Sequence, residues 1–580
     1  MYILGVSCFR DDATAALLRD GAIVGIAEEE RFIRIKHSVH KPNGLFVTSL
    51  EESEPLDGFE LRFFPINGIE FLLREAGIDL TDIDYIAYDF DFRIRIDRFD
   101  EFKPISEIAP PEEHNKLISC WQYWQRLLRD FAQRCQAKLV YVPHHLAHAS
   151  GTVLSSGFEQ TNFMIIDGFG ELSATTLGFF DGEFKILHEV PLPHSLGLLY
   201  SAITKLLGFR PFSGEQKTMG LAAYGKDIYR TQLEKMAWIT ADGFGTNPDY
   251  IWTYLDMGSF RPSALPQLLG VPPRDHTISA VDGDYPHIAC SLQLQLERIV
   301  FHLIDILNSI HPSERLCLAG GVALNCQLNG KIAQRPDVGE LFIQPQAGDS
   351  GTALGAAYYQ HFYLTGQRPE QLRHAYWGPS YSNSEVRATL DRLKLPYRRL
   401  DDVTEETAKL LEEGKIVGWF QGRSECGPRA LGNRSILANC AIKGIDDAIN
   451  LYVKNRETWR PFAASILDED CADYLTVDLS SPYMLLTVPL TDRGQRELVA
   501  ASHKNGTTRP QTVSRETNPK FHRLLKEFKR RTGVGALLNT SFNVRGEPIV
   551  NNPTEAIQDF YLTGLDALVI NDFLLSKDDN

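Results

Sequence analysis

Several features are scarce or missing in this 580-residue sequence. Its nine cysteines include no C-x-x-C pair, which argues against a disulfide framework and against a cysteine-ligated zinc site. There is no run of about 18 apolar residues, so we expect no transmembrane helix. The first residues, Met1 to Gly5, enter a strand pattern directly and lack the basic start of a signal peptide. We therefore expect a cytoplasmic protein.

Positive charge is also in short supply. The 59 Lys and Arg residues are outnumbered by 75 Asp and Glu residues, and the net charge is −16. This balance argues against non-specific binding to nucleic acid, which needs an excess of basic residues. It leaves room for a local cationic pocket. There are no low-complexity tracts and no repeats of solenoid type, so we expect a soluble globular enzyme or binding protein that does not bind nucleic acid or membranes.

The length predicts at least two domains, because a single hydrophobic core stops growing well below 580 residues. The strand and helix pattern is interrupted between Gly366 and Asn383 by prolines, glycines and polar residues, and it restarts at Glu385. We place a linker at 365–383. This predicts an N-terminal domain over residues 1–370 and a C-terminal domain over 384–580. Within the first, the heptad-like apolar spacing of Ile288 to Ile310 predicts a long core helix.

Cations are concentrated in one stretch of the C-terminal half, from Gly422 to Arg460. The stretch contains Arg423, Arg429, Arg434, Lys443, Lys454, Arg456 and Arg460. Gly427-Pro428 and Gly432-Asn433 place several of them on turns, and guanidinium groups on tight turns suit an oxyanion such as phosphate. From composition alone, a surface charge run and an anion-binding cradle are about equally supported.

The first third of the chain contains two similar units of strand, acidic turn and strand. The first runs from Tyr2 to Leu18 around Asp11-Asp12, and Asp20-Gly21 after it predicts a hairpin. The second pairs Phe163 to Ile166 with Ala174 to Phe180 around a turn that begins at Asp167. Nucleotide-binding folds of the actin, sugar-kinase and Hsp70 type are built by this kind of duplication, for which two such units are weak evidence.

Two histidines suggest half of a metal site. Pro143 starts a predicted helix after the strand Lys138 to Val142, so His144 and His148 stand at i and i+4 on one helix face. Asp349, on a glycine-rich turn before another helix, is a candidate third ligand, because two histidines and one carboxylate form a facial metal site with open positions. The alternative is a pair of ordinary polar histidines.

A glycine pair suggests a nucleotide loop. Gly320 and Gly321 lie between the predicted buried strand Leu316 to Ala319 and a helix that begins near Asn325. Glycines let the backbone approach a ligand closely, and a helix N-terminus favours phosphate. On its own this signal is weak.

Nine segments, in order along nearly the whole chain, resemble one family. They are EEERFIRIKH, HHLAHA, GEQKTMGLAAYG, LCLAGGVALNC, AGDSGTALGAA, GPRALGNRSI, VKNRETWRPFA, TRPQTV and LLNTSFNVRGEPIV. The chain resembles the O-carbamoyltransferases, which include the tobramycin, cephamycin and novobiocin carbamoyltransferases and nodulation protein U. The resemblance implies an α/β fold with an N-terminal domain of actin/Hsp70 type, like threonylcarbamoyladenosine synthase, and a C-terminal YrdC-like domain.

The resemblance also implies a two-step reaction. The C-terminal domain would condense carbamoyl phosphate with ATP to give carbamoyl adenylate and pyrophosphate. The N-terminal domain, with an iron-type divalent metal, would pass the carbamoyl group to a hydroxyl of a small-molecule natural product or sugar. The resemblance implies ATP, as its Mg²⁺ complex, and Fe(II) as cofactors, and the sequence does not identify the acceptor alcohol.

Site residues are carried over by motif. Residues matching those that hold carbamoyl phosphate and ATP are Arg429, Lys454, Arg460, Arg509, Ser541 and Asn543. The metal ligands match His144, His148 and Asp349, and the nucleotide-binding residues match Asp167, Gly320, Gly321 and Asn325. Arg429, Lys454 and Asp12 are the predicted catalytic residues.

One position departs from the family. Members often carry a His-Asp pair in the first strand turn, where this chain has Asp11-Asp12 after Arg10. Asp12 is therefore carried over as a catalytic residue, no role is assigned to Asp11, and a simple hairpin turn is about as well supported. The alternatives are a non-catalytic actin/Hsp70-type nucleotide-binding protein, tRNA threonylcarbamoylation, which would suit a more basic surface, and hydrogenase maturation, whose acylphosphatase and paired-cysteine segments are not visible.

Overall fold

The computed structural model describes residues 1–10, 12–38, 64–98, 111–252 and 264–577. The chain forms two compact units. Unit 1 comprises Met1–Glu29 and His37–Leu372, and unit 2 comprises Glu30–Lys36 and Arg373–Asn580. The break between the units falls inside the predicted linker at 365–383. A short N-terminal segment, Glu30–Lys36, groups with unit 2, which the sequence pattern did not indicate.

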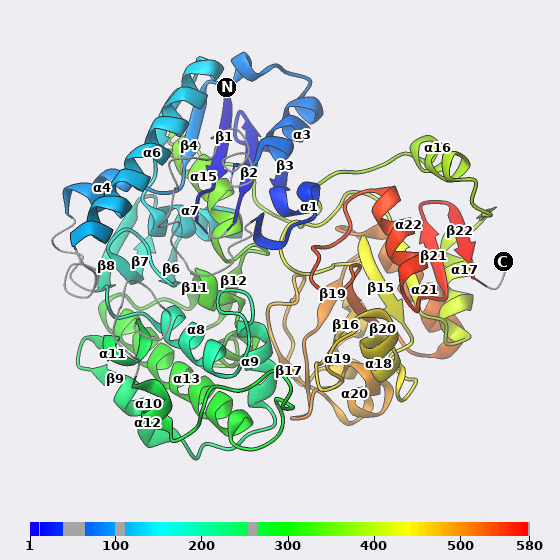
Figure 1. Ribbon diagram of the computed structural model, residues 1–580. Helices are drawn as coiled ribbons and strands as arrows, with labels where there is room; N and C mark the ends of the chain where they lie inside the picture. Colours follow the sequence, from blue (N-terminus) through cyan, green and yellow to red (C-terminus); the bar gives the residue numbers. More distant parts are fainter. Residues whose placement is uncertain (11, 39–63, 99–110, 253–263, 578–580) are drawn as a thin grey trace. The chain divides into compact units, whose positions relative to one another are not determined.

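The first sheet of unit 1 has five strands in the order β3-β2-β1-β4-β5 (Figure 1). β1 (Tyr2–Ser7), β2 (Thr14–Arg19) and β3 (Ala22–Glu28) are antiparallel neighbours. β4 (Tyr85–Tyr88) and β5 (Lys138–Tyr141) extend the sheet parallel to β1. The hairpin predicted at Asp20-Gly21 joins β2 to β3, so this prediction is confirmed.

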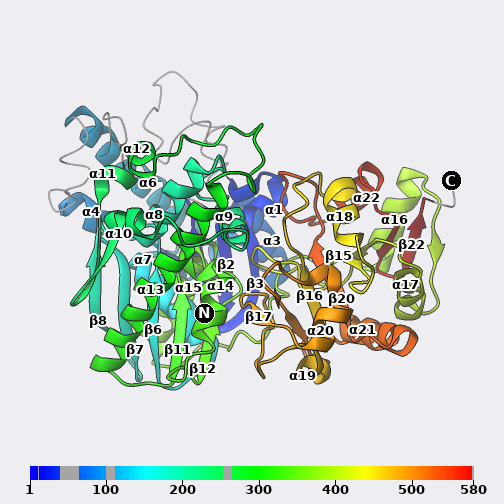
Figure 2. The same cartoon turned by 90° about the horizontal axis from the view of Figure 1, so that it is seen from below.

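The second sheet repeats this topology, in the order β12-β11-β6-β7-β8 (Figure 2). β6 (Thr161–Ile166), β7 (Ser173–Phe180) and β8 (Phe184–Pro191) are antiparallel neighbours. β11 (Arg315–Ala319) and β12 (Glu340–Ile343) run parallel to β6. The predicted duplication of strand units is confirmed, and it extends to two whole sheets with the same connections.

Two helices pack against each other between these sheets. α15 (Thr352–Thr365) lies on β1 and β2, whereas α7 (His144–Ser156) lies on β6 and β11. The packing is close enough to require glycine. A Cβ atom on Gly5 would lie 1.9 Å from the backbone oxygen of Ala353, so any larger residue in β1 would push α15 away.

The other elements of unit 1 surround this framework. They are α3 (Ile66–Ala76), η3 (Leu80–Asp82), α4 (Phe92–Asp97), α6 (Pro111–Cys135), α8 (Leu196–Leu206), α9 (Glu215–Ala222), α10 (Arg230–Met236), β9 (Ala237–Thr240), β10 (Gly243–Thr246), α11 (Pro248–Ile251), α12 (Leu265–Leu269), α13 (Tyr285–Ile310), η5 (Gly321–Leu324), α14 (Cys326–Ile332) and η6 (Asp349–Gly351). The helix predicted from residue 288 to 310 is therefore confirmed as α13. Its apolar stripe is buried, as expected for a core helix.

Unit 2 is built on an eight-stranded sheet in the order β13-β22-β21-β14-β15-β20-β16-β19. The strands are β13 (Arg398–Arg399), β14 (Val417–Phe420), β15 (Arg434–Ala438), β16 (Ala463–Leu467), β19 (Gln511–Val513), β20 (Ala536–Ser541), β21 (Ala567–Ile570) and β22 (Phe573–Ser576). β14 pairs with β21 in parallel and β16 with β19 in parallel, and the remaining pairs are antiparallel. The sheet is thus mixed.

Helices and short strands complete unit 2. They are α16 (Asn383–Leu393), α17 (Val403–Glu412), α18 (Ile445–Ala448), the π-helix η7 (Ile449–Val453), η8 (Asp468–Asp470), α19 (Cys471–Tyr474), β17 (Val488–Pro489), α20 (Asp492–Glu497), η9 (Val499–Ala501), β18 (Thr507–Thr508), α21 (Pro519–Thr532) and α22 (Pro553–Leu562). α1 (Glu29–Ile33) and η1 (Lys36–Ser38) each contain residues of both units.

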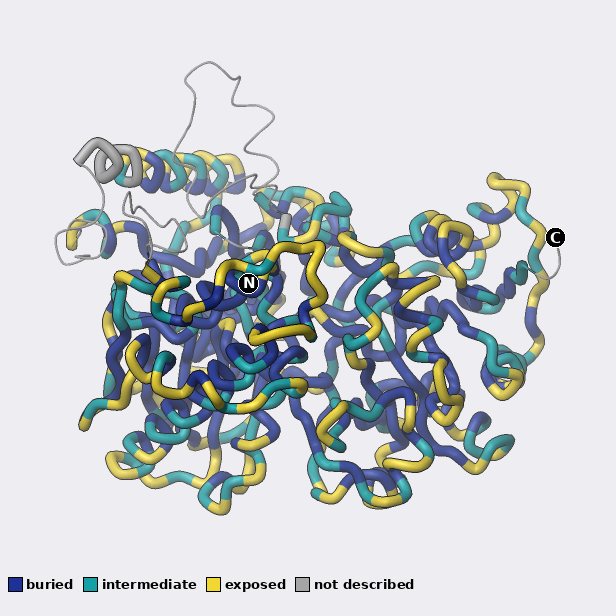
Figure 3. Tube along the Cα trace, turned by 60° about the horizontal axis from the view of Figure 1, so that its bottom comes forward, coloured by how far each residue is buried: buried dark blue, intermediate teal, exposed yellow. Residues whose placement is uncertain are grey.

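Buried residues are concentrated along the strands of each unit, and exposed residues lie on turns and outer helix faces (Figure 3). The predicted α/β class is confirmed. The further assignments, actin/Hsp70-like for the N-terminal domain and YrdC-like for the C-terminal domain, stay predictions. Among the described residues, no helix combines the length and apolar character needed to span a membrane.

Candidate functional site

Four side chains of unit 1 gather into what we call the His–Asp cluster: His144, His148, Asp167 and Asp349. Each offers one ligand atom, and these atoms all lie within 4.8 Å of one another. The structure therefore brings together the three residues predicted as metal ligands. It adds Asp167, which the sequence assigned to nucleotide binding.

The sheet topology explains why residues so far apart in sequence meet. His144 opens α7 directly after β5, Asp167 follows β6, and Asp349 lies in η6 beyond β12. These strands are parallel members of the two sheets. Ligand sites in α/β folds form beyond the carboxyl ends of such strands, where loops converge.

The spacing within the His–Asp cluster suits a metal ion. His144 Nε2 lies 3.2 Å from Asp167 Oδ2 and 3.5 Å from Asp349 Oδ1, and His148 Nε2 lies 3.4 Å from Asp349 Oδ1. Ligand atoms that sit about 2.1 Å from a shared ion are about 3.0 to 3.4 Å apart in octahedral or tetrahedral geometry. The four side chains therefore need to move little to share one ion.

The two histidines are prepared differently. His144 Nδ1 lies 3.2 Å from the backbone oxygen of Asp89, which accepts a hydrogen bond from it, and this bond turns Nε2 toward the carboxylates. Both imidazoles are completely buried, and within the described part of the chain neither ring nitrogen of His148 makes a hydrogen bond. A buried polar ring without hydrogen bonds is costly, and metal ligation would satisfy it. The residues thus fit a divalent metal.

The electrostatics of the His–Asp cluster favour a bound cation. Burial and the Arg10 guanidinium lower the pKa of His144, but Asp349 and Asp167 outweigh them and raise it to about 10. Burial alone would raise the pKa of Asp349, yet Arg10 and His144 hold it well below its ordinary value. The carboxylates therefore stay ionised and attract positive charge.

Arg10 and Asp89 also belong to this neighbourhood, and the sequence analysis gave neither a role. Arg10 Nη1 lies 3.0 Å from His144 Nε2, and Arg10 Nη2 donates to Asp89 Oδ2 at 2.5 Å. Arg10 Nη1 can donate to Nε2 only where that nitrogen carries no proton, which is the form of His144 that binds a metal ion. In the metal-free protein the raised pKa of His144 favours the protonated ring, so Arg10 and a proton are alternative partners of Nε2. The signal in sequence was a charged residue at the end of each of two strands, β1 and β4.

Glu171 fixes the first turn of α7. Its carboxylate accepts hydrogen bonds from the backbone N–H of His144 at 2.9 Å and of Asp91 at 2.8 Å. An anion at a helix N-terminus is favourable. Arg95 holds the same loop from the other side by donating to the backbone oxygen of Glu171 at 2.9 Å. The position of His144 thus depends on a carboxylate 27 residues away.

The predicted nucleotide loop follows β11 as expected. Gly320 has a φ of 92°, and a Cβ atom there would lie 2.3 Å from the backbone oxygen of Ile166, so only glycine fits. The N–H of Gly321 donates to Asp167 Oδ1 at 2.8 Å, which ties the loop to the His–Asp cluster. The side chain of Asn325 caps α14 and bonds to Gln293, a structural role in this structure.

Asp12 has an unexpected partner. Its Oδ1 lies 3.0 Å from His37 Nδ1, and both side chains are partly exposed. His37 has a φ of 62°, an unfavourable conformation for a residue with a side chain, and such strain is often found at functional sites. Asp11, the residue that replaces the family histidine, lies outside the described residues. A His–Asp pair is therefore present in this turn region, but with the histidine supplied from further along the chain.

The second candidate site is a group of cations in unit 2, which we call the cation cluster. Its members are Lys36, Arg429, Lys454, Arg456, Arg460, Arg509 and Arg545. They influence one another electrostatically. It therefore contains four of the predicted carbamoyl phosphate and ATP residues and three cations that were not predicted as site residues.

Lys454 sits at the centre of this cluster, directly after the π-helix η7. Its Nζ donates to Asn543 Oδ1 at 2.7 Å and also bonds to the backbone oxygen of Ser541. The predicted residues Ser541 and Asn543 therefore hold Lys454. π-helical turns occur frequently at functional sites, because they redirect the following side chain. Asn455, with a φ of 45°, continues the strained segment.

The cation cluster has more positive than negative charge in a poorly solvated environment. Burial, Arg456 and Arg460 lower the pKa of Lys454 well below its ordinary value. Burial, with Arg460 and Arg509, does the same to Arg456. Cations that repel one another in this way are unfavourable unless an anion joins them. The arrangement therefore suits a ligand with several negative charges.

The segment Glu30–Lys36 contributes to this site from far away in sequence. Arg31 Nη2 donates to the backbone oxygen of Gly427 at 2.6 Å, and Arg34 Nη2 pairs with Glu547 at 2.7 Å. Much of Lys36 is exposed to solvent, but nearby protein atoms desolvate its ammonium group and lower its pKa. The positive charges of Arg460 and Arg429 lower this pKa further, and the negative charge of Glu30 raises it. The motif EEERFIRIKH is the sequence signal for this contribution.

Not every cation of the Gly422–Arg460 stretch belongs to the cluster. Arg434 is fully buried in β15, donates to the backbone oxygens of Gln421 and Pro379, and lies 3.6 Å from the centre of the Phe420 ring. Arg423 donates to the backbone oxygen of Gly378 at 3.0 Å. These two arginines hold the turns in place, so the stretch combines structural and site cations.

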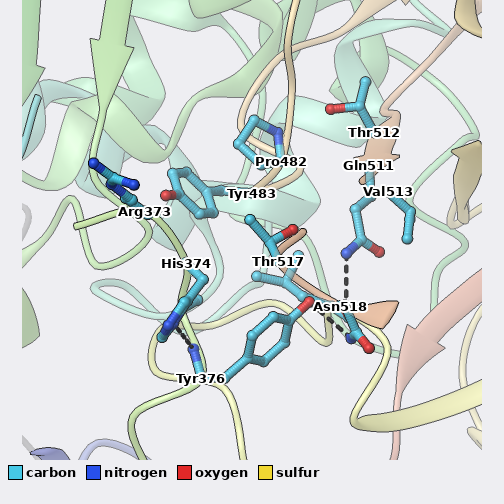
Figure 4. A pocket seen from close by; sticks show the side chains of 12 residues that line it. Arg373, His374, Tyr376, Pro482, Tyr483, Gln511, Thr512, Val513, Thr517 and Asn518 are labelled. Carbon is cyan, nitrogen blue, oxygen red and sulfur yellow. Dashed lines mark hydrogen bonds between the residues drawn. The ribbon is translucent and has the colours of Figure 1, made fainter. Parts of the chain in front are cut away.

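A separate small pocket of unit 2 lies beside β19. Figure 4 shows Tyr376 and Asn518 pointing toward each other in its wall, with Asn518 Nδ2 3.0 Å from the Tyr376 hydroxyl. The hydroxyl itself donates to the backbone oxygen of Leu431, and Gln511 Nε2 donates to the same oxygen at 2.7 Å. These polar groups are satisfied within the protein, so the pocket adds nothing to the candidate site.

Comparison with known families gives matches over both units. The family model described as carbamoyltransferase N-terminus matches residues 2–358, and the model described as carbamoyltransferase C-terminus matches residues 408–577. The first contains the His–Asp cluster. The second contains every member of the cation cluster except Lys36.

Similar proteins span the whole chain. An uncharacterized protein of Synechocystis sp., sll1178, is 35% identical over 99% of this chain and 97% of its own length. Nodulation protein NolNO of Sinorhizobium fredii is 36% identical over 98% of this chain and 79% of its own. A 3'-hydroxymethylcephem-O-carbamoyltransferase of Amycolatopsis lactamdurans is 30% identical over 68% of this chain and 72% of its own.

Proposed function

The chain belongs to the carbamoyltransferase family and is a transferase, and we propose that it is an ATP-dependent O-carbamoyltransferase that works in two steps. In the first step, unit 2 makes carbamoyl adenylate from carbamoyl phosphate and ATP. In the second step, unit 1 transfers the carbamoyl group to the hydroxyl of a small-molecule alcohol. The observation that carries this proposal is the cation cluster around Lys454, whose excess positive charge needs a polyanionic ligand.

The first step needs two phosphate-bearing substrates in one place. Carbamoyl phosphate gives up its phosphate to water and leaves carbamate, whose oxygen attacks the α-phosphorus of ATP, and pyrophosphate departs. One carbamoyl adenylate, one phosphate and one pyrophosphate result. In-line attack between anions requires that their charges be neutralised and positioned, which is the part assigned to the cation cluster and to ATP-bound Mg²⁺.

Within the cation cluster the residues have distinct tasks. Arg429, Arg460 and Arg509 would bind phosphate oxygens, since guanidinium groups can bond two oxygens at once. Lys454 is held by Ser541 and Asn543, so its charge is fixed at one point. Its lowered pKa comes from burial and from neighbouring arginines, and an anionic ligand would restore the charged form.

The second step is assigned to the His–Asp cluster. His144, His148 and Asp349, with Asp167, would hold a divalent ion, and their nitrogen and oxygen donors suit iron, zinc or manganese. When bound, such an ion acts as a Lewis acid toward a carbonyl or phosphate oxygen. The Gly320-Gly321 loop is tied to Asp167 by the Gly321 N–H, and its lack of side chains would let the adenylate approach the cluster closely.

The acceptor hydroxyl must lose its proton as its oxygen bonds to the carbamoyl carbon and AMP departs with the electron pair. We assign this proton to the pair formed by Asp12 and His37. With Nδ1–H donated to Asp12, the imidazole takes the proton at Nε2 and later releases it to water. The pair thereby fills the role that a histidine at position 11 would have in other family members.

The products of the first step test this proposal directly. The full chain is incubated with ATP, Mg²⁺ and carbamoyl phosphate labelled in its carbonyl carbon, and pyrophosphate and AMP are measured. We expect pyrophosphate release that requires carbamoyl phosphate. Absence of pyrophosphate with every acceptor tried would refute the assignment. AMP should accumulate only when an alcohol accepts the label, so screening sugars and natural-product alcohols also identifies the acceptor.

A further inference from the structure

We propose that Arg10 is a built-in counter-cation of the candidate metal centre, which lowers the affinity of the His–Asp cluster for a divalent ion and keeps its ligands assembled. Nothing in the family assignment gives Arg10 this role. The inference rests on the proposed function only in that the His–Asp cluster is taken to bind a metal.

The first argument is that Arg10 contacts side chains that would also bind the metal ion. Arg10 Nη1 lies 3.0 Å from His144 Nε2 and 3.2 Å from Asp349 Oδ2. Both residues are candidate ligands. A guanidinium at these distances competes with a divalent ion for the lone pairs of His144 and Asp349, and it repels the ion as well.

The second argument is that Arg10 is held in place. Its other terminal nitrogen, Nη2, donates to Asp89 Oδ2 at 2.5 Å, and the guanidinium lies 4.8 Å from the centre of the Phe90 ring. The side chain of Arg10 is 8% exposed and that of Asp89 is fully buried. An arginine so anchored cannot swing into solvent when an ion arrives, so its charge stays next to the centre.

The third argument is the charge balance. Asp89, Asp167 and Asp349 contribute three negative charges in a buried space, and Arg10 contributes one positive charge. The two charges left over equal those of a divalent ion. With the ion bound, the centre is neutral, which allows a phosphate or carbamoyl oxygen to approach it without a large electrostatic penalty.

Asp89 connects these effects to the ligands themselves. Its carboxylate also accepts a hydrogen bond from the hydroxyl of Thr352, at the start of α15, and Thr352 in turn lies three residues after Asp349. Its backbone oxygen accepts from His144 Nδ1. Arg10 and Asp89 therefore form one unit that positions two ligands and sets the charge between them.

Metal affinity measured on the full-length, metal-stripped protein tests this role. Titration calorimetry with Mn²⁺ and with Zn²⁺ should show that Arg10→Gln binds at least about 10-fold more tightly than the parent protein, because one repelling charge is gone. The Arg10→Gln protein should unfold at a lower temperature than the parent without metal, and metal should raise its melting temperature by more.

A double variant separates charge from structure. Arg10→Gln with Asp89→Asn removes one charge of each sign and restores the original balance, so its metal affinity should return to within about threefold of the parent value. Arg95→Gln is the matched control. Arg95 is another buried arginine of unit 1 whose guanidinium lies 5.2 Å from the Phe90 ring, and it donates to loop carbonyls. Its loss should reduce stability without tightening metal binding.

Three results would overturn the proposal. One is an Arg10→Gln protein that binds metal as weakly as the parent or more weakly. Another is a double variant that binds as tightly as the single one. The third is absence of Mn²⁺ and Zn²⁺ binding in both parent and variant. Pyrophosphate release, measured in parallel on the same proteins, depends on unit 2, so its failure would count against the proposed function and not against Arg10.

Discussion

The two candidate sites have opposite charge. In unit 1 the carboxylates of Asp89, Asp167 and Asp349 face two histidines and Arg10, so that site attracts a cation. In unit 2 seven cations crowd together, and burial with neighbouring positive charges lowers the pKa values of Lys36, Lys454, Arg456 and Arg460, so that site attracts an anion. The chain is acidic overall, and its net charge describes neither site. Local arrangement decides what each unit binds.

The difference also shows in how the sites are built. The His–Asp cluster stands at the ends of parallel strands, where backbone geometry fixes its residues. The cation cluster comes from turns, a π-helix and the segment Glu30–Lys36, which is anchored by Arg31 and Arg34. A two-step transferase benefits from this separation, because polyanionic substrates and a metal ion make opposite electrostatic demands.

The largest expected effect comes from the cation cluster. Arg429→Ala should lower pyrophosphate release at least about 1000-fold, because the site loses a guanidinium that neutralises charge at the reacting phosphates. Metal content should stay that of the parent. Lys443→Ala is the matched control, since Lys443 lies in the same cationic stretch but is exposed. Normal pyrophosphate release by Arg429→Ala would contradict the assignment of the cation cluster as the site that binds carbamoyl phosphate and ATP.

The second-largest expected effect concerns the His–Asp cluster of unit 1. His148→Ala should abolish carbamoyl transfer and lower metal affinity at least about 100-fold. Losing a hydrogen-bond partner of a metal ligand costs up to about 100-fold, and losing the ligand itself should cost at least as much. Pyrophosphate release should persist. His145→Gln is the control, because His145 is on the same helix but bonds to Thr176. Joint loss of both steps in a folded His148→Ala protein would show that the two sites are not separate.

The smallest effect is a pH dependence within unit 2. Burial and Arg509 lower the pKa of His503 to about 4, so the folded protein keeps this ring neutral where the unfolded chain, with an ordinary pKa near 6.5, takes up a proton. Stability should therefore fall as pH drops from about 6.5 to about 4, by on the order of 3 kcal/mol.

Two comparisons test whether His503 causes this dependence of stability on pH. His503→Gln should make stability depend less on pH between about 6.5 and 4. Bound pyrophosphate should have the same effect, because an anion beside Arg509 cancels part of the positive charge that disfavours protonation of His503. Urea unfolding at a series of pH values measures both effects. An unchanged slope in His503→Gln would assign the pH dependence to other groups.

The predictions that held best were those based on local patterns. The hairpin at Asp20-Gly21, the strand pair around Asp167 and the long helix α13 follow from turn residues and apolar periodicity, which act over a few residues. The grouping of His144 with His148 follows from helix geometry alone. Asp349 was expected nearby through its residue type and its glycine-rich turn.

Long-range relations could not be predicted in this way. No local pattern indicates that Arg10 and Asp89 meet His144, because they follow strands whose pairing is decided by the whole sheet. The sequence also did not show which cations of the Gly422–Arg460 stretch are structural and which belong to the cation cluster. Arg434 and Arg429 look alike in sequence, and it is the set of hydrogen bonds from Arg434 to backbone oxygens that makes Arg434 structural.

By itself, the sequence determined the α/β class, the duplicated strand units, the helical face shared by His144 and His148, and the resemblance that names the family. The tertiary structure decided the membership of each site. It placed Asp167 in the His–Asp cluster and Arg10 beside that cluster, Lys36 in the cation cluster and His37 beside Asp12. The physical reason is that residue type determines the chemistry of each side chain, whereas charge balance depends on distances between side chains, which only the folded chain sets.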